Sequence, residues 1–213
     1  MRAFLLVPLL AACATGRSAT VQAPRVDYHQ HLVSPPFAPI VKLPVRDGKK
    51  LLAELDAAGI DKAVVLSVGY SFTDERKKLD DPDRLTRDEN DWTSVQVAAS
   101  GGRLIGFCSA NPLRPAALEE LKRCLALRGM KGIKLRNIYF DVATVVTAET
   151  TPEEAALVAK RIRQVGAERV LYGSDLSPPG GSVGSGWQIF RDRVPLTAAE
   201  FRIIANNLTR FAR

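Results

Sequence analysis

The sequence of 213 residues contains only two histidines and three cysteines, and these small numbers limit its chemistry. Three cysteines are too few for the disulfide framework that holds small secreted domains together. No apolar run reaches the ~18 residues that a membrane-spanning helix requires. No Gly-x-Gly-x-x-Gly follows the first expected strand, so the sequence gives no support for a dinucleotide site. These absences argue against a scaffold built on disulfides, a membrane-spanning helix and a dinucleotide-binding fold of the Gly-x-Gly-x-x-Gly type.

The chain also lacks a concentrated stretch of one charge sign, although its net charge is +7. Basic residues are scattered among acids, as in residues 74–91 (DERKKLDDPDRLTRDEND), a pattern typical of a solvated surface. No basic stripe with interleaved aromatic residues is present, so we expect no nucleic-acid partner. With 46% hydrophobic residues, the composition is that of a globular protein with a sizeable core.

Residues 1–16 (MRAFLLVPLLAACATG) have the layout of a secretory signal, with one positive charge, a short apolar run and then small residues. The tetrad LAAC at residues 10–13 resembles the lipobox of bacterial lipoproteins, in which cleavage leaves a lipidated cysteine first. We therefore expect a signal peptide over residues 1–12, lipidation of Cys13 and a tether over residues 13–24. This predicts a protein on the periplasmic side of the bacterial envelope, held to the outer membrane by its lipid alone. An ordinary signal with an incidental cysteine, or a buried helix, is the alternative.

The other two cysteines lie in regular elements of the expected fold. Cys108 falls in an apolar strand-like run and Cys124 on a helix. They could pair in an oxidising compartment, but two lone cysteines form no framework. We interpret them as buried thiols.

Strand-like and helix-like segments alternate along residues 25–213, which we expect to form one α/β domain. Such alternation predicts βαβ units and a parallel sheet. The six expected strands cover residues 26–33, 63–70, 103–111, 132–135, 138–146 and 169–175.

Local signals predict where the helices begin and end. Leucines share one face over residues 49–59, and Gly59 is expected to end that helix. Thr-x-x-Glu capping boxes and prolines predict the other helix starts. These signals are Thr86 with Glu89, Pro115, Thr151 with Glu154, and Thr197 with Glu200. Residues 176–186 are rich in Gly, Pro and Ser and are expected to form a loop.

A chain of this pattern folds either as a (β/α)8 barrel or as an open doubly wound sheet. Polar residues gather where the expected strands end, namely His29, His31, Tyr70, Asn111, Lys134 and Asp175. Functional residues at the C-terminal ends of several strands are typical of the barrel. The visible units are fewer than the eight of a complete barrel. We therefore expect an incomplete (β/α)8 barrel.

The pair His29 and His31 is the most specific chemical feature of the sequence. Residues i and i+2 of a strand point to the same face, so the two imidazoles can converge on one metal ion. Asp175 ends the last expected strand, and in a closed barrel that strand lies beside the first. Its carboxylate is therefore the third candidate ligand and the candidate catalytic group. The alternatives are surface histidines on a strand and an Asp that caps a helix or forms a turn.

Four further residues are weaker candidates. Lys134 could be a metal ligand, a substrate contact or a lysine at the rim of the barrel. Asp141 lies within an expected strand and is either a polar contact inside the barrel or a structural hydrogen-bonding group. Tyr70 and Asn111 stand at strand ends, where loop residues are often polar.

The ordered segments VDYHQHLVSP, ELDAAGIDKAVVLSVGY, RLIGFCSANP, GMKGIKL, IYFDVATVV and RVLYGSD together resemble the amidohydrolase-related metal-dependent hydrolases. The terminal segment VPLTAAEFRIIANNLTRFAR is similar to the last helix of that family. This resemblance implies a (β/α)8 barrel with one divalent metal, usually zinc, held by His29, His31 and Asp175. It also implies hydrolysis of a small-molecule substrate by metal-activated water, with Asp175 managing the proton. Related barrels are carboxy-lyases, so decarboxylation is the rival reaction.

The chain departs from that family at one junction. In the family, further histidines come from strands five and six, whereas both histidines of this chain are already assigned. The segment GIKL is similar to strand four and NIYFDVA to strand seven, which predicts a deletion between Leu135 and Arg136. A tight turn, or one long strand over residues 132–146, explains the spacing but not the missing histidines. The alternative hypothesis is therefore a non-catalytic remnant, a truncated product that binds metal weakly or not at all.

Overall fold

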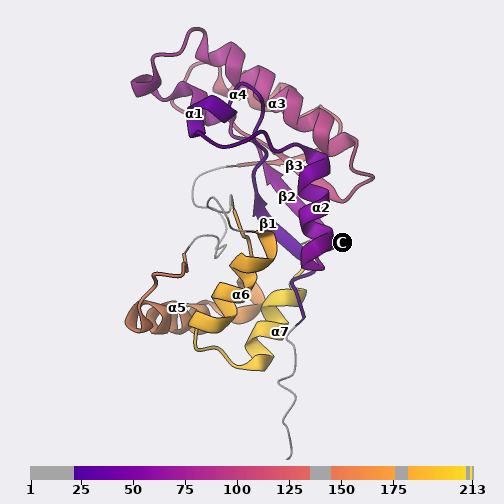
Figure 1. Ribbon diagram of the computed structural model, residues 1–213. Coiled ribbons are helices and arrows are strands. Elements are labelled where there is room, and N and C mark those ends of the chain that lie inside the picture. The colour runs from indigo at the N-terminus through magenta and orange to yellow at the C-terminus, as the bar shows by residue number, and fades with distance from the viewer. Residues whose placement is uncertain (1–21, 135–144, 176–181, 210–211, 213) are drawn as a thin grey trace, which may run out of the picture.

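The computed structural model describes residues 22–134, 145–175, 182–209 and 212. Within them, four parallel strands form one sheet in chain order (Figure 1). The strands are β1 (Val26–Gln30), β2 (Lys62–Leu66), β3 (Leu104–Cys108) and β4 (Met130–Ile133). The α/β class and the parallel sheet are thus as expected. Cys13, Asp141 and the junction between Leu135 and Arg136 lie outside the described residues, as does most of the strand expected over residues 138–146.

The helices that follow the strands begin and end at capping residues. They are α1 (Ala38–Val41), α2 (Gly48–Ala58), α3 (Pro82–Ala98) and α4 (Ala117–Leu125), with short 3-10 turns η1 (Gly69–Thr73) and η2 (Glu75–Lys77). Asp47 caps α2 by accepting the Lys50 amide, and Gly59 ends it with a φ of 68°. The expected end at Gly59 is confirmed. Helix α4 begins at Ala117 with Ala116 in the cap position, two residues after the start that was expected at Pro115.

The expected start of α3 at Thr86 is wrong. The helix begins at Pro82, and the Asp81 side chain caps it by accepting the Arg84 amide. An Asp cap followed by Pro at the first position leaves no amide hydrogen bond to lose, so it outcompetes the later box. Thr86 instead lies inside the helix, where its hydroxyl donates to the carbonyl oxygens of Pro82 and Gly69.

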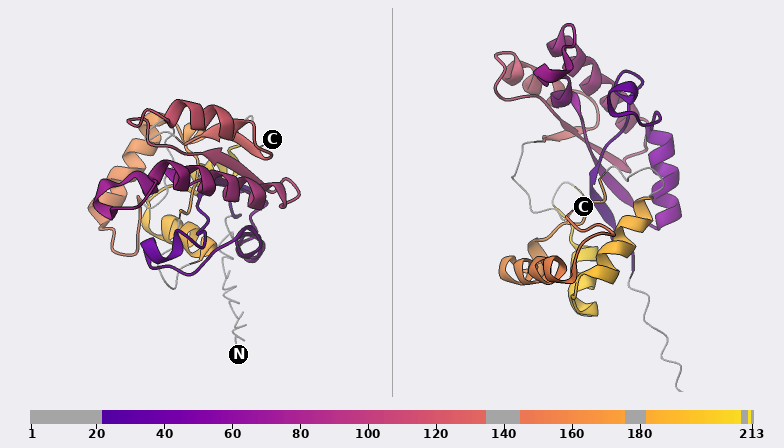
Figure 2. Two further views of the ribbon diagram at one scale, coloured as in Figure 1. Left: turned by 90° about the horizontal axis from the view of Figure 1, so that it is seen from above. Right: turned by 60° about the vertical axis from the view of Figure 1, so that its left-hand side comes forward.

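Residues 145–209 contribute α5 (Pro152–Val165), the 3-10 turn η3 (Ala167–Arg169), α6 (Val183–Arg193) and α7 (Ala198–Asn206). The capping boxes of Thr151 and Thr197 are both formed, as expected. The loop expected to run to residue 186 ends earlier, because Ser182 and Ser185 form a third capping box that starts α6. Figures 1 and 2 show α5 to α7 gathered at one end of the molecule and α3 and α4 at the other.

Residues 169–175 were expected to be a strand, but they form no regular strand of the sheet. The segment nevertheless runs beside β1. The Tyr28 amide donates to the Tyr172 carbonyl oxygen at 2.8 Å, and the Asp175 amide donates to the His29 carbonyl oxygen at 2.6 Å. We call this contact between β1 and residues 170–175 the seam.

Apolar side chains cover both faces of the sheet. Leu51 and Leu55 of α2 pack with Val65 and Val97 on one face. On the other face, Tyr28, Leu66 and Phe107 pack with Leu171, Leu208 and Ala212, which come from the C-terminal part of the chain. A third cluster, built around Tyr172, Trp187, Phe190 and Phe201, holds α5 to α7 together. None of the described helices combines the length and the apolar character that a membrane span needs.

Cys108 and Cys124 form a disulfide, so their interpretation as buried thiols is wrong. Their Cα atoms are 6.0 Å apart, within the range that a disulfide requires. The bond ties the end of β3 to α4 across 16 positions of sequence. The pairing could not be read from the sequence because it depends on how α4 packs against the sheet.

Candidate metal centre

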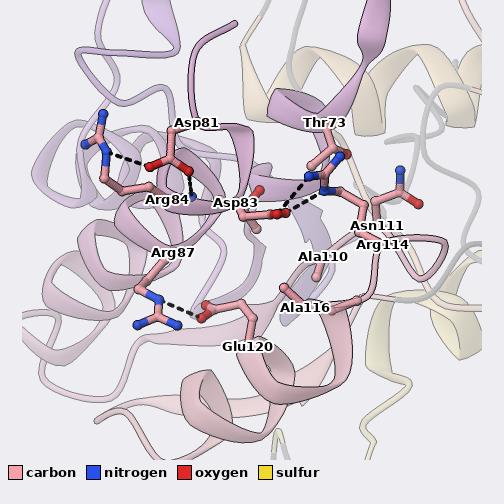
Figure 3. A pocket seen from close by; sticks show the side chains of 12 residues that line it. Thr73, Asp81, Asp83, Arg84, Arg87, Ala110, Asn111, Arg114, Ala116 and Glu120 are labelled. Carbon is pink, nitrogen blue, oxygen red and sulfur yellow. Dashed lines mark hydrogen bonds and ion pairs between the residues drawn. The ribbon is translucent and has the colours of Figure 1, made fainter.

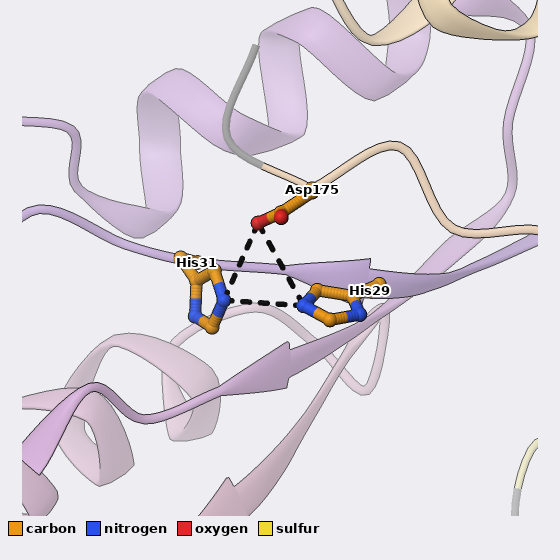
Figure 4. Close-up of side chains that lie close together, drawn as sticks. All are labelled: His29, His31 and Asp175. Carbon is orange, nitrogen blue, oxygen red and sulfur yellow. Dashed lines mark hydrogen bonds and ion pairs between the residues drawn. The ribbon is translucent and has the colours of Figure 1, made fainter. Parts of the chain in front are cut away.

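His29 and His31 point to the same side of β1 and present the same ring nitrogen to one point (Figure 4). Their Nε2 atoms are 3.3 Å apart, and the rings meet edge to face. His31 is buried, whereas His29 is partly exposed. The alternation of side chains along a strand accounts for this convergence, since one intervening residue returns the chain to the same face.

Asp175 approaches the two rings from across the seam. Its Oδ1 atom lies 3.3 Å from Nε2 of His31 and 3.7 Å from Nε2 of His29. The residue has a φ of 60°, in the left-handed region that a non-glycine residue seldom adopts. One donor atom from each of the three residues lies within 4.8 Å of the other two. The structure thus brings together the three residues predicted as ligands.

Two neighbours fix the orientation of His31. Its Nδ1 atom is 2.6 Å from the Leu66 carbonyl oxygen, a partner that accepts only, so Nδ1 carries the hydrogen and Nε2 keeps its lone pair. The Arg46 guanidinium donates to the His31 carbonyl oxygen at 2.6 Å and is itself held by Glu54 at 2.9 Å. Burial, and next the positive charge of Lys134, lower the pKa of His31 well below its usual 6.5. Neutral imidazole with a fixed tautomer is the form that ligates metals.

The donor set fits a divalent cation. Two imidazole nitrogens and one carboxylate oxygen are a three-ligand set used by catalytic zinc, which keeps a further position for water or substrate. His29 lies in β1, His31 follows that strand directly, and Asp175 belongs to the segment on the other side of the seam. Any relative movement across the seam therefore changes the distances between the donors.

A chamber of about 600 Å³ opens beside this centre. It is lined by Tyr70, Ser71, Thr73, Asp74, Lys77, Ala110, Asn111, Pro112, Leu113 and Lys134. Lys134 joins the chamber to the metal centre, because its Nζ atom lies 3.2 Å from Nε2 of His31 and 5.0 Å from the centroid of the Tyr70 ring. The three weaker candidates Tyr70, Asn111 and Lys134 thus line one space.

A smaller cleft of about 260 Å³ lies between α3 and α4 (Figure 3). Its charged side chains pair with one another. Arg114 binds Asp83 through two hydrogen bonds, and Arg87 lies 3.5 Å from Glu120. These pairs neutralise the lining of the cleft, whereas the chamber presents the ammonium groups of Lys77 and Lys134.

Sequence reasoning missed the polar residues of the seam. Asp27, Gln30 and Ser174 are buried and hydrogen-bonded to one another beside the metal centre. One signal was available for Asp27, since it precedes His29 by two positions and so shares a strand face with the histidines. Gln30 and Ser174 gave no such signal, because Ser174 meets Gln30 and Asp27 across 144 and 147 positions of sequence.

No family model and no curated protein sequence matches the chain. Among solved structures, an Agrobacterium tumefaciens protein, ATU3138 in its apo form, aligns with a TM-score of 0.54 at 13% identity, over 85% of this chain and 93% of that one. A 2,6-dihydroxybenzoate decarboxylase in complex with 2,6-dihydroxybenzoate aligns at 19% identity and a TM-score of 0.40, over 75% and 53%. A zinc-bound amidohydrolase from Burkholderia multivorans aligns at 13% identity and a TM-score of 0.37, over 85% and 96%. At these identities the first likeness concerns the fold alone, and the other two are too distant to carry weight.

Proposed function

We propose that this chain is a metal-dependent hydrolase of the amidohydrolase type, with an incomplete (β/α)8 barrel. The observation that carries the proposal is the meeting of His29, His31 and Asp175 at one point, from two segments far apart in sequence. Three donors of these types in one place are more specific than the His-x-His pair alone. The resemblance of the sequence to that family adds support.

His29, His31 and Asp175 would hold the cation, and we propose zinc because the donor set suits it. When bound, the cation would lower the pKa of a coordinated water towards ~7 and polarise the scissile group. The substrate, a small molecule, would enter through the chamber and stack against Tyr70. Asp175 would take a proton and return it to the leaving group.

A carboxy-lyase reaction is the second candidate, and the lining of the chamber favours it. Lys77 and Lys134 bring two ammonium groups to the chamber beside the metal centre, against the one carboxylate of Asp74. Positive charge there would attract the carboxylate that a decarboxylase removes. Release of carbon dioxide from a carboxylate substrate, rather than uptake of water, would identify this reaction.

Zinc content of the purified mature protein, measured by mass spectrometry, tests the proposal. We expect about one zinc per chain, and we expect His29→Ala and Asp175→Asn to remove it. Asp192→Asn, on the exposed face of α6, is the matched carboxylate control and should keep the metal. Equal zinc in wild type and His29→Ala would show that the proposed site is wrong. A wild type without zinc, and without turnover, would favour the remnant.

Two proposals concern residues outside the described part of the chain. Sequencing the source DNA across the codons of Leu135 and Arg136 tests the proposed deletion, because extra in-frame codons with histidines would show a longer enzyme. Cys13→Ser tests the proposed lipid anchor at the periplasmic side of the outer membrane. If that variant takes up labelled lipid and fractionates like wild type, the anchor proposal fails.

A further inference from the structure

Asp27 lies at the middle of the seam and is fully buried. One of its carboxylate oxygens accepts the backbone amides of His29 and Ser174, both at 3.0 Å. The other accepts the Gln30 side-chain amide at 2.9 Å and the Ser174 hydroxyl at 2.6 Å. One carboxylate therefore binds both arms of the metal centre, namely the strand that carries the histidines and the segment that carries Asp175.

The two donors to the first oxygen are neighbours of the ligands along the chain. The His29 amide belongs to a ligand itself, and the Ser174 amide belongs to the residue before Asp175. A shift of either arm would stretch one of these bonds while the other held. The backbone bonds from Tyr28 to Tyr172 and from Asp175 to His29 flank the carboxylate on the same seam.

Close packing makes this arrangement sensitive. A Cβ atom at Gly173 would lie 2.3 Å from Cβ of His29, so the two arms approach as nearly as a glycine allows. The parallel ladder between β1 and β2 is also irregular between Asp27 and Gln30. Regular strand pairing therefore does not fix this stretch, and side-chain hydrogen bonds take its place.

We propose that Asp27 is a positioning residue that sets the distance between the histidine nitrogens and the Asp175 carboxylate. It acts through backbone amides and does not itself ligate the metal. The role requires a carboxylate, because four donors converge on two oxygens and an amide would bring its own N–H groups among them. The inference rests on the proposed metal centre for its functional meaning. The positioning itself is independent of whether a metal binds.

The test compares Asp27→Asn with wild type in the full mature chain. The two histidines give just two imidazole spin systems in a long-range ¹H–¹⁵N spectrum, once any purification tag is removed. We expect Asp27→Asn to shift both sets of ring signals and to weaken zinc binding, measured by calorimetry, by about 10- to 100-fold, as is typical when a support of a metal ligand is lost. Glu120→Gln, a buried carboxylate in a hydrogen-bonded network between α3 and α4, is the matched control. It should keep wild-type ring signals and zinc affinity even where it lowers stability.

Ser174→Ala keeps the test decisive if Asp27→Asn does not fold. It removes the hydroxyl bond to Asp27 and leaves the backbone bond, so zinc affinity should fall by about threefold to tenfold, in line with the loss of one hydrogen bond. The Asp27→Asn and Ser174→Ala effects should also combine to less than their sum, because the two residues share one network.

Different outcomes separate the two proposals. If wild type binds zinc and Asp27→Asn matches it in affinity and ring signals, the positioning role is wrong and the metal centre stands. If wild type binds no zinc but Asp27→Asn still displaces both ring signals, the proposed function is wrong and the positioning role stands. Ring signals in Ser174→Ala identical to wild type, with unchanged affinity, would also overturn the positioning role.

Discussion

The two parts of the molecule hold their share of the metal centre by different means. Residues 22–134 supply His29 from β1 and His31 from the position directly after it, and α2 covers one face of the sheet to which β1 belongs. Residues 145–209 are mainly helical and supply Asp175 from an irregular segment at the seam. Because only one residue separates His29 from His31, the backbone fixes these two candidate ligands relative to each other. The third ligand depends on contacts between segments that are more than 140 positions apart in sequence.

This difference predicts where the centre is vulnerable. Changes within the sheet should alter stability and leave the histidine pair intact as long as the sheet folds. Changes at the seam should disturb the centre itself, because the hydrogen bonds of the seam join the backbone of His29 to that of Asp175.

Gly173→Ala should break the seam. The added Cβ would lie 2.3 Å from Cβ of His29 and 2.9 Å from its backbone nitrogen, so the arms must separate. We expect a loss of about 3 kcal/mol in the free energy of unfolding, the upper end for overpacking, measured by urea denaturation. Zinc affinity should fall at least as far as in Asp175→Asn.

Gly184→Ala is the control for Gly173→Ala in the same part of the chain. It lies in α6, and its new Cβ would meet nothing closer than 3.5 Å. Alanine in a helix should add about 0.5–1 kcal/mol of stability and leave zinc binding unchanged. Equal zinc affinity in the two glycine variants would contradict the importance of the seam.

The disulfide lets the sheet be weakened without touching the seam. Replacing both Cys108 and Cys124 by serine removes a cross-link over 16 positions. We expect a loss of about 2–3 kcal/mol in the free energy of unfolding, because the unfolded chain regains the freedom of that loop. Zinc affinity of the folded variant should match wild type. A parallel loss of zinc affinity would show that the sheet and the seam do not behave as separate units.

The sequence predicted the meeting of His29, His31 and Asp175 better than it predicted the elements around them. Strand alternation placed His29 and His31 together, and the expectation that the last segment lies beside the first brought Asp175 to them. Both inferences use properties that any parallel fold imposes on its strands. The resemblance to a known family pointed to the same residues.

What the sequence did not predict depends on distant partners. The segment before Asp175 looked like a strand, but close approach of Gly173 to His29 and the positive φ of Asp175 prevent regular pairing. The acceptor role of Asp27 and the disulfide arise from packing between elements, which no local pattern records. The predicted start of α3 was wrong because two capping signals, at Asp81 and at Thr86, lie close together in the sequence.

Glu89 offers a contrast with Asp27 within residues 22–134. Both carboxyl groups are buried, but among the described residues the Glu89 carboxyl group has one hydrogen-bond partner, the Ser34 hydroxyl at 2.5 Å. Burial raises the pKa of Glu89 from 4.5 to about 7, and the Ser34 bond only partly opposes this. Between pH 4.5 and pH 7, Glu89 is therefore protonated in the folded state and ionised in the unfolded state. Stability contributed by this group is complete below pH 4.5 and is lost as the pH rises through 7.

The measurement is the free energy of unfolding of wild type and Glu89→Gln across that range. Wild type should lose about 3 kcal/mol relative to Glu89→Gln between the two ends, since the pKa rises from 4.5 to about 7 and each pKa unit corresponds to about 1.4 kcal/mol. Ser34→Ala should move the loss to higher pH, because it removes the bond that favours the ionised form. The same pH dependence in wild type and Glu89→Gln would rule out Glu89 as its source.

Lys134→Met tests whether the positive charge of Lys134 weakens zinc binding at the centre. The ammonium group lies 3.2 Å from the His31 nitrogen that would ligate a cation, so the two compete for one lone pair. Repulsion between charges at this range is worth several kcal/mol at an effective dielectric constant of about 20. Movement of the lysine towards the Tyr70 ring relieves most of that repulsion, so we expect zinc to bind only about tenfold more tightly in Lys134→Met.

Lys77→Met, in the same chamber but hydrogen-bonded to the Ser71 carbonyl oxygen, should leave zinc affinity unchanged. Weaker zinc binding in Lys134→Met would instead make the lysine a ligand, and unchanged binding would make it a rim residue. Tighter zinc binding in Lys134→Met would show that the Lys134 ammonium group opposes the metal. Its role would then be to bind the substrate in the chamber.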